Sequence, residues 1–362
     1  MYRFLLLIVA GLLLIGCGGG SEDKSAEKEV AQGSDTSASL VRPGEEKHLA
    51  NIRQLSFGGE NAEAYFSADG RQLIFQSKRD SFQCDQIFTM NIDGSDVKLV
   101  STGKGRTTCS FFAPDGSEYI YASTHQADPN CPPPPDMSRG YVWGLFPGYD
   151  IYRVNFESGE MVNLTPDNPY YDAECAYSPD GQKIVFTSLR DGDIDLYTMN
   201  TDGSGLVRIT SEFGYDGGPF FSPDSKWICY RADHPTEESA IADYKTLLEH
   251  NEIRPGNLEL FVIRADGSER RQITKLGGAN FCPYFHPDGK RLIFASNHHT
   301  GDRNFDLFMV NIDGSGLEQI TFDEEFEGFP MFSADGKKLV FASNRNQGQP
   351  GETNIFIADW ID

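Results

Sequence analysis

The chain has 362 residues and a formal net charge of −23 at pH 7, because 54 acidic residues outnumber 31 Lys and Arg residues. Such a charge excludes a general affinity for nucleic acid and disfavours electrostatic adsorption to anionic lipid. Hydrophobic residues make up 39% of the chain, and its length suits one large or two ordinary domains.

A targeting signal is predicted for residues 1–17. Arg3 precedes an apolar run from Phe4 to Ile15, which is too short for a transmembrane helix. The run ends in Leu14-Ile15-Gly16-Cys17, which resembles the lipobox of bacterial lipoproteins. The resemblance implies that Cys17 becomes the lipidated first residue, and Gly18 after it favours the outer membrane. The alternative is an ordinary secretory signal in which Cys17 has no role.

Residues 18–48 are predicted to be a disordered tether. This segment is rich in Gly, Ser, Glu, Lys and Ala and contains no aromatic residue. It cannot bury enough apolar surface to offset the entropy of ordering it. A flexible chain of this length spans about 30 Å, which is enough to hold a domain away from a membrane.

From residue 49 to 362 one turn recurs six times. Its clearest copy is Ser178-Pro179-Asp180-Gly181, in which Pro fixes the φ angle of a turn and Asp and Gly suit the positions after it. The six turns centre on Asp69, Asp115, Asp180, Asp224, Asp288 and Asp335, at intervals of 46, 65, 44, 64 and 47 residues. A period in the mid-forties is typical of a β-propeller, and the two long intervals indicate blades with insertions of about twenty residues.

Each repeat is predicted to contain four strands. An innermost apolar strand precedes the turn, a buried strand such as 184–187 follows it, and a third strand such as 195–197 leads through an Asp-Gly turn to a fourth. The last repeat has only three strands. Residues Arg53 to Ser56 match the fourth-strand pattern ahead of the first repeat. We therefore expect the N-terminal strand to complete the last blade and remove an open edge.

These repeats resemble the TolB-type propeller repeat, also called PD40 or WD40-like. The resemblance rests on six imperfect copies of the Pro-Asp-Gly turn, each followed by a strand with an acid or amide and then an aliphatic–aromatic pair, and it covers residues 49–362. It implies an all-β fold, a six-bladed propeller of four-stranded blades with one short helical insertion. The N-terminal α/β domain of TolB is not seen. The same propeller type also resembles accessory domains of prolyl oligopeptidases and oligogalacturonate lyase.

The two insertions are predicted between the second and third strands of blades 2 and 4. Residues 125–148 contain Cys131 followed by four prolines and then Tyr141 and Trp143, which favours an ordered loop with polyproline II character. Residues 236–255 show apolar residues at helical spacing after Thr236, a plausible N-cap. This second insertion is predicted to form one short helix over a face of the propeller.

Six cysteines remain after Cys17. Cys109, Cys175 and Cys282 fall on predicted innermost strands and Cys229 on a predicted second strand, where a free thiol behaves as a small apolar side chain. Cys84 and Cys131 lie in corresponding loops of neighbouring blades. In an oxidising compartment they could form a disulfide, with Cys109 as a rival partner for either.

A ring of basic residues is predicted at the end of the second strands, where each member stands ten positions after a turn Asp. It could bind an anionic ligand, or a metal through its histidines, as a His-based site does in oligogalacturonate lyase. The alternative is pairing within each blade, for example of the arginines with Asp80 or Asp191. The ring consists of Arg79, His125, Arg190, His234, His298 and Arg345, with His299 adjoining.

An acidic collar is predicted just before the innermost strands, at one mouth of the channel. It could hold Ca²⁺ or a peptide terminus, and ordinary solvation of a water-filled channel is the alternative. The collar consists of Asn61, Thr107, Asp172, Asp216, Asn280 and Glu327, with Glu63 and Glu174 two positions further on. We expect one concavity over this mouth to contain Tyr141, Trp143, Arg190, His298, His299 and Glu327.

The chain lacks a Gly-x-Ser-x-Gly elbow, a P-loop, a His-Glu-x-x-His motif and a Cys-x-x-Cys pair. The interpretation is therefore a binding or scaffold module, a monomeric outer-membrane lipoprotein facing the periplasm or the cell surface. Its partner would be an envelope protein, peptide or glycan, it would contact the membrane through the lipid alone, and no cofactor is expected. The alternative is an enzyme, a metal-assisted carbohydrate lyase or hydrolase that resembles oligogalacturonate lyase.

Overall fold

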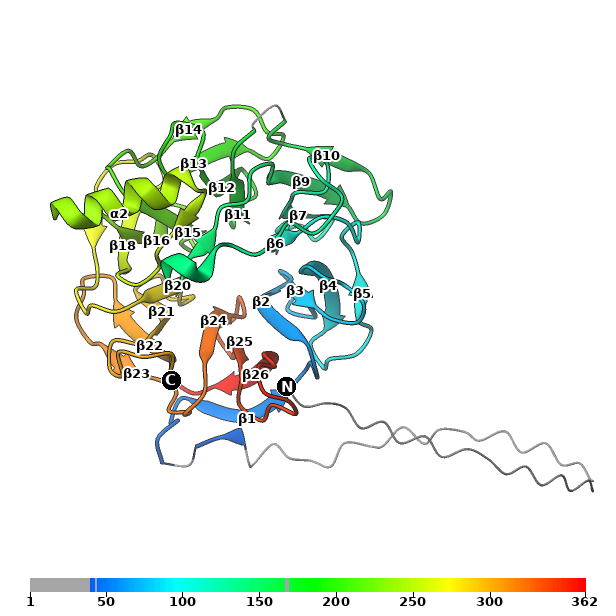
Figure 1. Ribbon diagram of the computed structural model, residues 1–362. Coiled ribbons are helices and arrows are strands. Elements are labelled where there is room, and N and C mark those ends of the chain that lie inside the picture. The colour runs from blue at the N-terminus through cyan, green and yellow to red at the C-terminus, as the bar shows by residue number, and fades with distance from the viewer. Residues whose placement is uncertain (1–39, 43, 167–168) are drawn as a thin grey trace, which may run out of the picture. The chain divides into compact units, whose positions relative to one another are not determined.

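The computed structural model describes residues 40–42, 44–166 and 169–362, which contain six four-stranded antiparallel sheets around a common axis (Figure 1). Blades 1 to 3 take consecutive stretches of the chain. Their strands are β2 (Glu60–Phe66), β3 (Gln72–Lys78), β4 (Gln86–Asn91) and β5 (Lys98–Leu99); β6 (Thr107–Phe112), β7 (Glu118–Ser123), β9 (Asp150–Asn155) and β10 (Met161–Asn163); and β11 (Asp172–Tyr177), β12 (Lys183–Ser188), β13 (Asp195–Asn200) and β14 (Val207–Arg208).

Blades 4 to 6 follow in the same order. Their strands are β15 (Tyr215–Phe221), β16 (Trp227–Asp233), β18 (Glu259–Arg264) and β19 (Arg271–Gln272); β20 (Asn280–Phe285), β21 (Arg291–Ser296), β22 (Asp306–Asn311) and β23 (Glu318–Gln319); and β24 (Glu327–Phe332), β25 (Lys338–Ser343), β26 (Asn354–Trp360) and β1 (Leu49–Gln54). The predicted six-bladed, all-β fold is confirmed.

The closure of the ring is also confirmed. Strand β1 pairs antiparallel with β26, with Arg53 opposite Ile357 and Gln54 opposite Phe356. Ile52 of β1 is fully buried, and Ser56 accepts a hydrogen bond from the backbone N–H of Ile355 at 2.8 Å. The same bond joins a fourth-strand hydroxyl to a third-strand N–H in every other blade, as in Thr210 with Leu196 and Thr321 with Leu307. Residues 49–56 therefore replace the missing fourth strand of blade 6 in detail.

The recurring turn is held by its Asp side chain. In each blade the carboxylate accepts the backbone N–H two residues further on, as in Asp69 with Arg71 and Asp335 with Lys337. The fourth residue of the turn has a positive φ angle in all six copies, which suits Gly. Blade 4 has Ser225 at this position, with φ of 61°. These turns and the Asp-Gly turns lie at one end of the axis, which we call the turn side.

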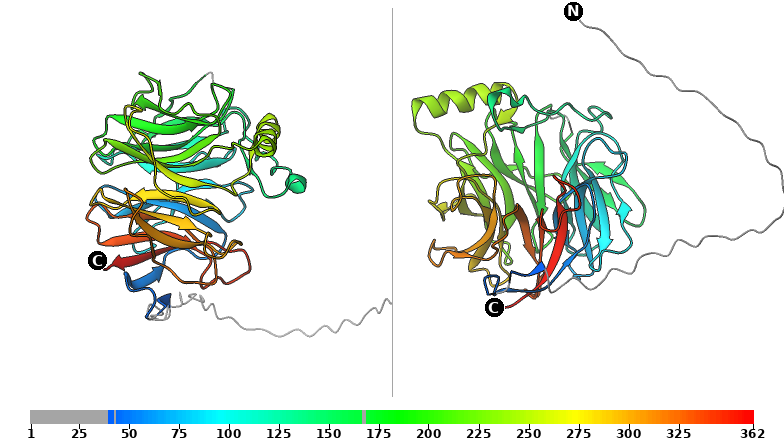
Figure 2. Two further views of the ribbon diagram at one scale, coloured as in Figure 1. Left: turned by 90° about the vertical axis from the view of Figure 1, so that its left-hand side faces the viewer. Right: turned by 60° about the horizontal axis from the view of Figure 1, so that its bottom comes forward.

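The two insertions lie at the opposite end, the insertion side (Figure 2). The first contains a short 3-10 helix, η1 (Met137–Arg139), and β8 (Trp143–Gly144); the second contains α2 (Glu238–Glu249) and β17 (Glu252–Ile253). Strands β8 and β17 pair with each other, so the insertions meet as one structure. The helix predicted in the second insertion is confirmed as α2, but its N-cap is Glu237 rather than Thr236, and it makes no side-chain capping bond. Tyr244 and Leu247 are the residues that it buries.

Residues 40–42 and 44–48, which the sequence analysis assigns to the tether, pack against blade 6. We call them the latch. Leu40 and Glu46 are buried, and Glu46 pairs with the buried guanidinium of Arg345 at 2.7 Å. Arg42 pairs with Asp323, and His48 stacks on Trp360. The predicted signal, Cys17 and the rest of the tether lie outside the described residues.

Candidate functional site

In four of the six blades, the basic residue of the ring is paired with the collar residue of the same blade. Arg190 donates to Asp172 at 2.8 Å, Arg79 to Asn61 at 3.2 Å, and His234 lies 3.0 Å from Asp216. Each pair comes from the facing ends of two adjacent antiparallel strands, so the two side chains stand at the same level. For Arg190 this corrects the suggested partner, because Asp191 instead accepts a hydrogen bond from Tyr197.

The six first-named residues of the collar are buried and therefore do not line an opening to solvent. All six are fully buried, including Asp172, Asp216 and Glu327. The basic partners also pack on aromatic rings of their own blades, as Arg190 does on Tyr197 and His298 on Phe308. Arg345 is the extreme case, since Glu327 and Glu46 enclose it. These side chains hold the second strands of the blades to the first.

The histidines do not converge. His125 and His298 each place Nδ1 within hydrogen-bond distance of a serine of their own strand, Ser123 and Ser296. His299 instead pairs with Asp306 at 2.8 Å. Across residues 40–42, 44–166 and 169–362, no group of three His, Cys, Asp or Glu side chains is placed to hold a metal ion.

The six residues expected in one concavity have the following surroundings. Tyr141 is 64% exposed, and its hydroxyl accepts a hydrogen bond from the indole of Trp143 at 3.2 Å. The Trp143 ring turns inward onto the guanidinium of Arg231. Neither of the two cavities described below is lined by any of the six. The insertion side carries both insertions, as expected, and the grouping of these six residues in one concavity stays a prediction.

Cys84 and Cys131 are joined by a disulfide with a Cα–Cα distance of 5.6 Å. The bond ties the first insertion to the loop after β3 of the neighbouring blade. Cys175, Cys229 and Cys282 are free and buried, and Cys109 is free and half-buried.

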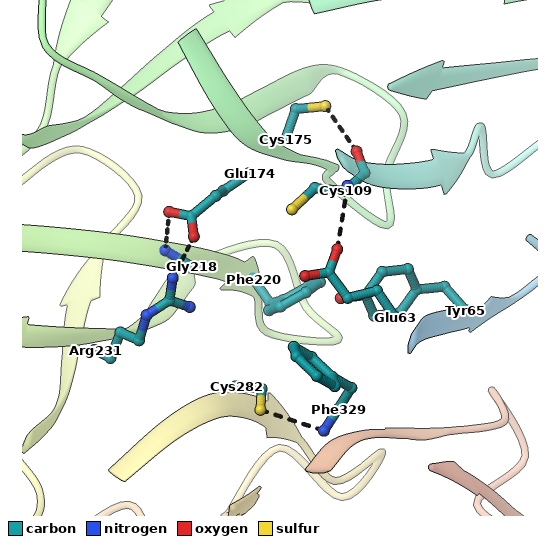
Figure 3. A pocket seen from close by; sticks show the side chains of 10 residues that line it. All are labelled: Glu63, Tyr65, Cys109, Glu174, Cys175, Gly218, Phe220, Arg231, Cys282 and Phe329. Atoms are coloured by element: carbon teal, nitrogen blue, oxygen red, sulfur yellow. Dashed lines mark hydrogen bonds and ion pairs between the residues drawn. The ribbon is translucent and has the colours of Figure 1, made fainter. Parts of the chain in front are cut away.

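Inside the channel, the innermost strands share a feature that the sequence analysis missed. Each has a bulge, and one residue of the bulge has a φ angle between 45° and 61°. These six residues are equivalent in the repeat: Glu63, Cys109, Glu174, Gly218, Cys282 and Phe329. These six residues surround a small cavity on the axis (Figure 3). Below it, Tyr65, Phe111 and Phe220 pack ring against ring and close the channel toward the turn side.

Arg231 enters this cavity although it belongs to a second strand. Gly218 makes this entry possible, because a Cβ at this position would collide with the guanidinium. Arg231 pairs with Glu174, which also accepts the backbone N–H of Gly218 at 2.9 Å. The adjacent glycines 217 and 218 on an innermost strand are the signal that could have indicated such an intruding side chain.

Glu63 is a carboxylate of this cavity whose pKa is shifted by its surroundings. One of its oxygens accepts the backbone N–H of Cys109 at 3.1 Å, and burial raises the pKa of Glu63 to about 7. The water-accessible volume of the cavity is about 20 Å³, which is room for a single water molecule. The axial cavity is therefore too small for a metabolite, a sugar or a peptide.

A second, open cavity of about 410 Å³ lies on the insertion side, between blades 2 and 3. We call it the lateral groove. Its residues come from both ends of the first insertion, from the start of β9 and from the loop before β11: Gln126, Ala127, Pro147, Gly148, Asp150 and Pro169. This volume falls within the usual range for ligand pockets.

A family model described as the TolB β-propeller domain matches residues 149–240 and 245–359. Among curated proteins, an uncharacterized protein of Agrobacterium fabrum is 27% identical over 146 residues, which are 40% of this chain and 42% of that protein. A TolB homolog of Chlorobium chlorochromatii is 24% identical over 139 residues, which are 32% of this chain and 31% of that protein. The chain thus spans less than half the length of these relatives.

Solved structures share the fold. TolB from Acinetobacter baumannii aligns with a TM-score of 0.54 at 16% identity, over 84% of this chain and 64% of that one. An oligogalacturonate lyase in complex with manganese aligns with a TM-score of 0.53 at 15% identity, over 85% and 80%. Similarity at this level of identity shows the architecture alone. No helix among the described residues is long and apolar enough to cross a membrane.

Proposed function

Since the chain belongs to the TolB β-propeller family, we propose that it is a binding module of the bacterial cell envelope. The proposal places its partner, an envelope protein, on the insertion side. The lipid on Cys17 would anchor it, and the acidic chain would contact the membrane only through that lipid.

The observation that carries this proposal is a group of exposed large apolar side chains in the insertion-side loops. Tyr141 and Met137 of the first insertion are 64% and 52% exposed. Tyr170 and Phe213, in the loops that lead into blades 3 and 4, are 48% and 41% exposed. All four lie in insertion-side loops. Exposed aromatic residues on loops held by a rigid scaffold are typical of protein-binding surfaces.

The pairing of β8 with β17 gives these loops a fixed shape. The disulfide holds one end of the first insertion, and Tyr244 of α2 donates its hydroxyl to Asp193 at 2.6 Å. Phe213 then packs edge-on against Tyr244. A surface held in this way loses little conformational entropy when it binds, which favours affinity.

The experiment is site-specific photo-crosslinking in living bacteria. A photoreactive phenylalanine analogue replaces Tyr141, Tyr170 or Phe213 one at a time, and adducts are detected by immunoblotting. We expect a discrete adduct from at least two of these positions. Leu206, which is 44% exposed near the Asp202-Gly203 turn on the turn side, is the matched control and should give none. Equal labelling from Leu206 would contradict the proposal.

A further inference from the structure

The lateral groove contains a carboxylate that differs from its equivalents in the other blades. Position 150 begins the third strand of blade 2, and the same repeat position carries an acid or amide in every blade. In blade 3, Asp195 pairs with Arg208 at 2.5 Å; in blade 5, Asp306 pairs with His299 at 2.8 Å. Asp195 thus has a cationic partner from its own blade, and Asp306 has an imidazole partner.

Asp150 has only neutral partners among the described residues. Its Oδ2 accepts the amide of Asn163 at 2.9 Å and the hydroxyl of Tyr152 at 3.4 Å, and Oδ1 lies 3.5 Å from the hydroxyl of Thr165. The remaining acid of the series, Glu259, accepts the backbone N–H of Gly277 at 2.7 Å and does not line the groove. Asp150 is therefore the member of the series that faces an open cavity without a cation.

The electrostatics of the groove favour a cation at this point. Burial raises the pKa of Asp150, and the nearby carboxylate of Asp172 adds to the effect. None of the six residues that line the groove is Lys or Arg. A half-buried carboxylate without an opposite charge is stabilised when a cation binds beside it, and its ionised form is then favoured.

We propose that the lateral groove binds a cationic side chain, arginine or lysine, of the protein partner, with Asp150 as its counter-ion. Ala127, Pro147 and Pro169 provide apolar walls for the aliphatic stem of such a side chain. The net charge of −23 favours approach of a basic segment from solution. This inference rests on the proposed function and specifies the chemistry of the partner.

The test uses the full-length protein in detergent micelles with ¹³C-methyl-labelled alanine, so that the methyl group of Ala127 reports on the groove. The probes are Nα-acetyl-arginine amide and its neutral counterpart, Nα-acetyl-citrulline amide, at constant ionic strength. We expect a saturable shift of the Ala127 signal with the arginine probe. The citrulline probe should bind at least fivefold more weakly.

Variants separate the charge of Asp150 from its structural role. Asp150→Asn should weaken arginine binding at least fivefold, whereas Asp128→Asn, an equal change at an exposed acid outside the groove, should leave it unchanged. Gln126→Lys should abolish binding by placing a cation in the groove, and Gln126→Glu should strengthen it. The two changes at Gln126 keep the test valid if Asp150→Asn does not fold.

Equal binding of the two probes, or undiminished binding by Asp150→Asn, would overturn the inference. Crosslinks from Tyr141 that persist alongside such a result would leave the proposed function intact. Arginine binding without any crosslinks would instead support the groove and argue against a protein partner on this side.

Discussion

Equivalent residues of the repeat make the same bond but face different surroundings. Arg190 and Arg345 both pair with the acid at the start of the first strand, and the spacing of 18 residues is the same in both blades. Only Arg345 is also covered by the latch, because blade 6 is the blade that the N-terminal segment crosses. The sequence shows the repeat position clearly, but it does not show which copy another segment will cover.

The pH dependence of stability is predicted to depend on Glu63. Its pKa is about 7 in the folded protein against 4.5 ordinarily, so the folded state binds a proton more strongly than the unfolded state. The contribution of Glu63 to the free energy of unfolding is therefore greatest below pH 4.5. It decreases by about 3 kcal/mol as the pH rises to about 7. Glu63→Gln should remove this decline and be the more stable protein at pH 7.5, measured by urea unfolding from pH 5 to 8.

The control for this prediction is Glu60→Gln on the same strand. Glu60 is exposed and pairs with Lys78 at 3.0 Å, so its removal should change stability by less than about 1 kcal/mol and leave the pH profile unchanged. Identical profiles for the parent and Glu63→Gln would show that the axial cavity is wetter than its burial indicates.

Among the elements, the closing strand was predictable and the latch was not. The pattern Arg53 to Ser56 repeats the fourth strand of the other blades, and the hydroxyl of Ser56 makes the expected bond. Residues 40–48 have no such pattern, and their composition resembles a linker. They are held by the buried ion pair between Glu46 and Arg345, which is a tertiary contact across 299 positions. Local composition carries no information about a partner that distant.

Three N-terminal deletions of increasing length test the latch and the closing strand separately. Deletion of residues 18–39 should leave the free energy of unfolding unchanged. Deletion of 18–46 removes Glu46 and uncovers Arg345, which should cost about 3 kcal/mol or more. Deletion of 18–57 also removes β1 and should cause aggregation through the open edge of β26. Thermal unfolding and light scattering measure the three; equal melting of the first two would show that the latch contributes nothing.

At the scale of the molecule, the sequence predicted the side that carries the loops and the way in which the ring closes. It did not predict the site, because the charged residues that repeat in every blade pair within their blades. The lateral groove and Arg231 depend instead on departures from the repeat. Asp150 lines an open cavity without the cation that its equivalent Asp195 has, and Gly218 lacks a side chain where its equivalents have one.

The proposed anchoring makes a prediction for the whole chain. Cys17→Ser should move the protein from the membrane fraction to the soluble periplasmic fraction, or leave its precursor unprocessed, because a serine cannot accept the thioether-linked lipid. Cell fractionation and the apparent mass on a gel measure both outcomes. A protein that stays processed and membrane-bound after this change would not be held by a lipid on Cys17.

The way in which the ring closes also determines when the first strand can find its partner during synthesis. Gln54 and its partner Phe356 are 302 positions apart, so the first strand to be synthesised waits for the last. At about 5–20 residues per second, that wait is roughly 15 to 60 seconds. During this interval Ile52, fully buried in the finished molecule, has no partner strand from its own chain. Because the ring has no free edge only after closure, the first strand of the growing chain must be kept from pairing with other chains until the final residues have been synthesised.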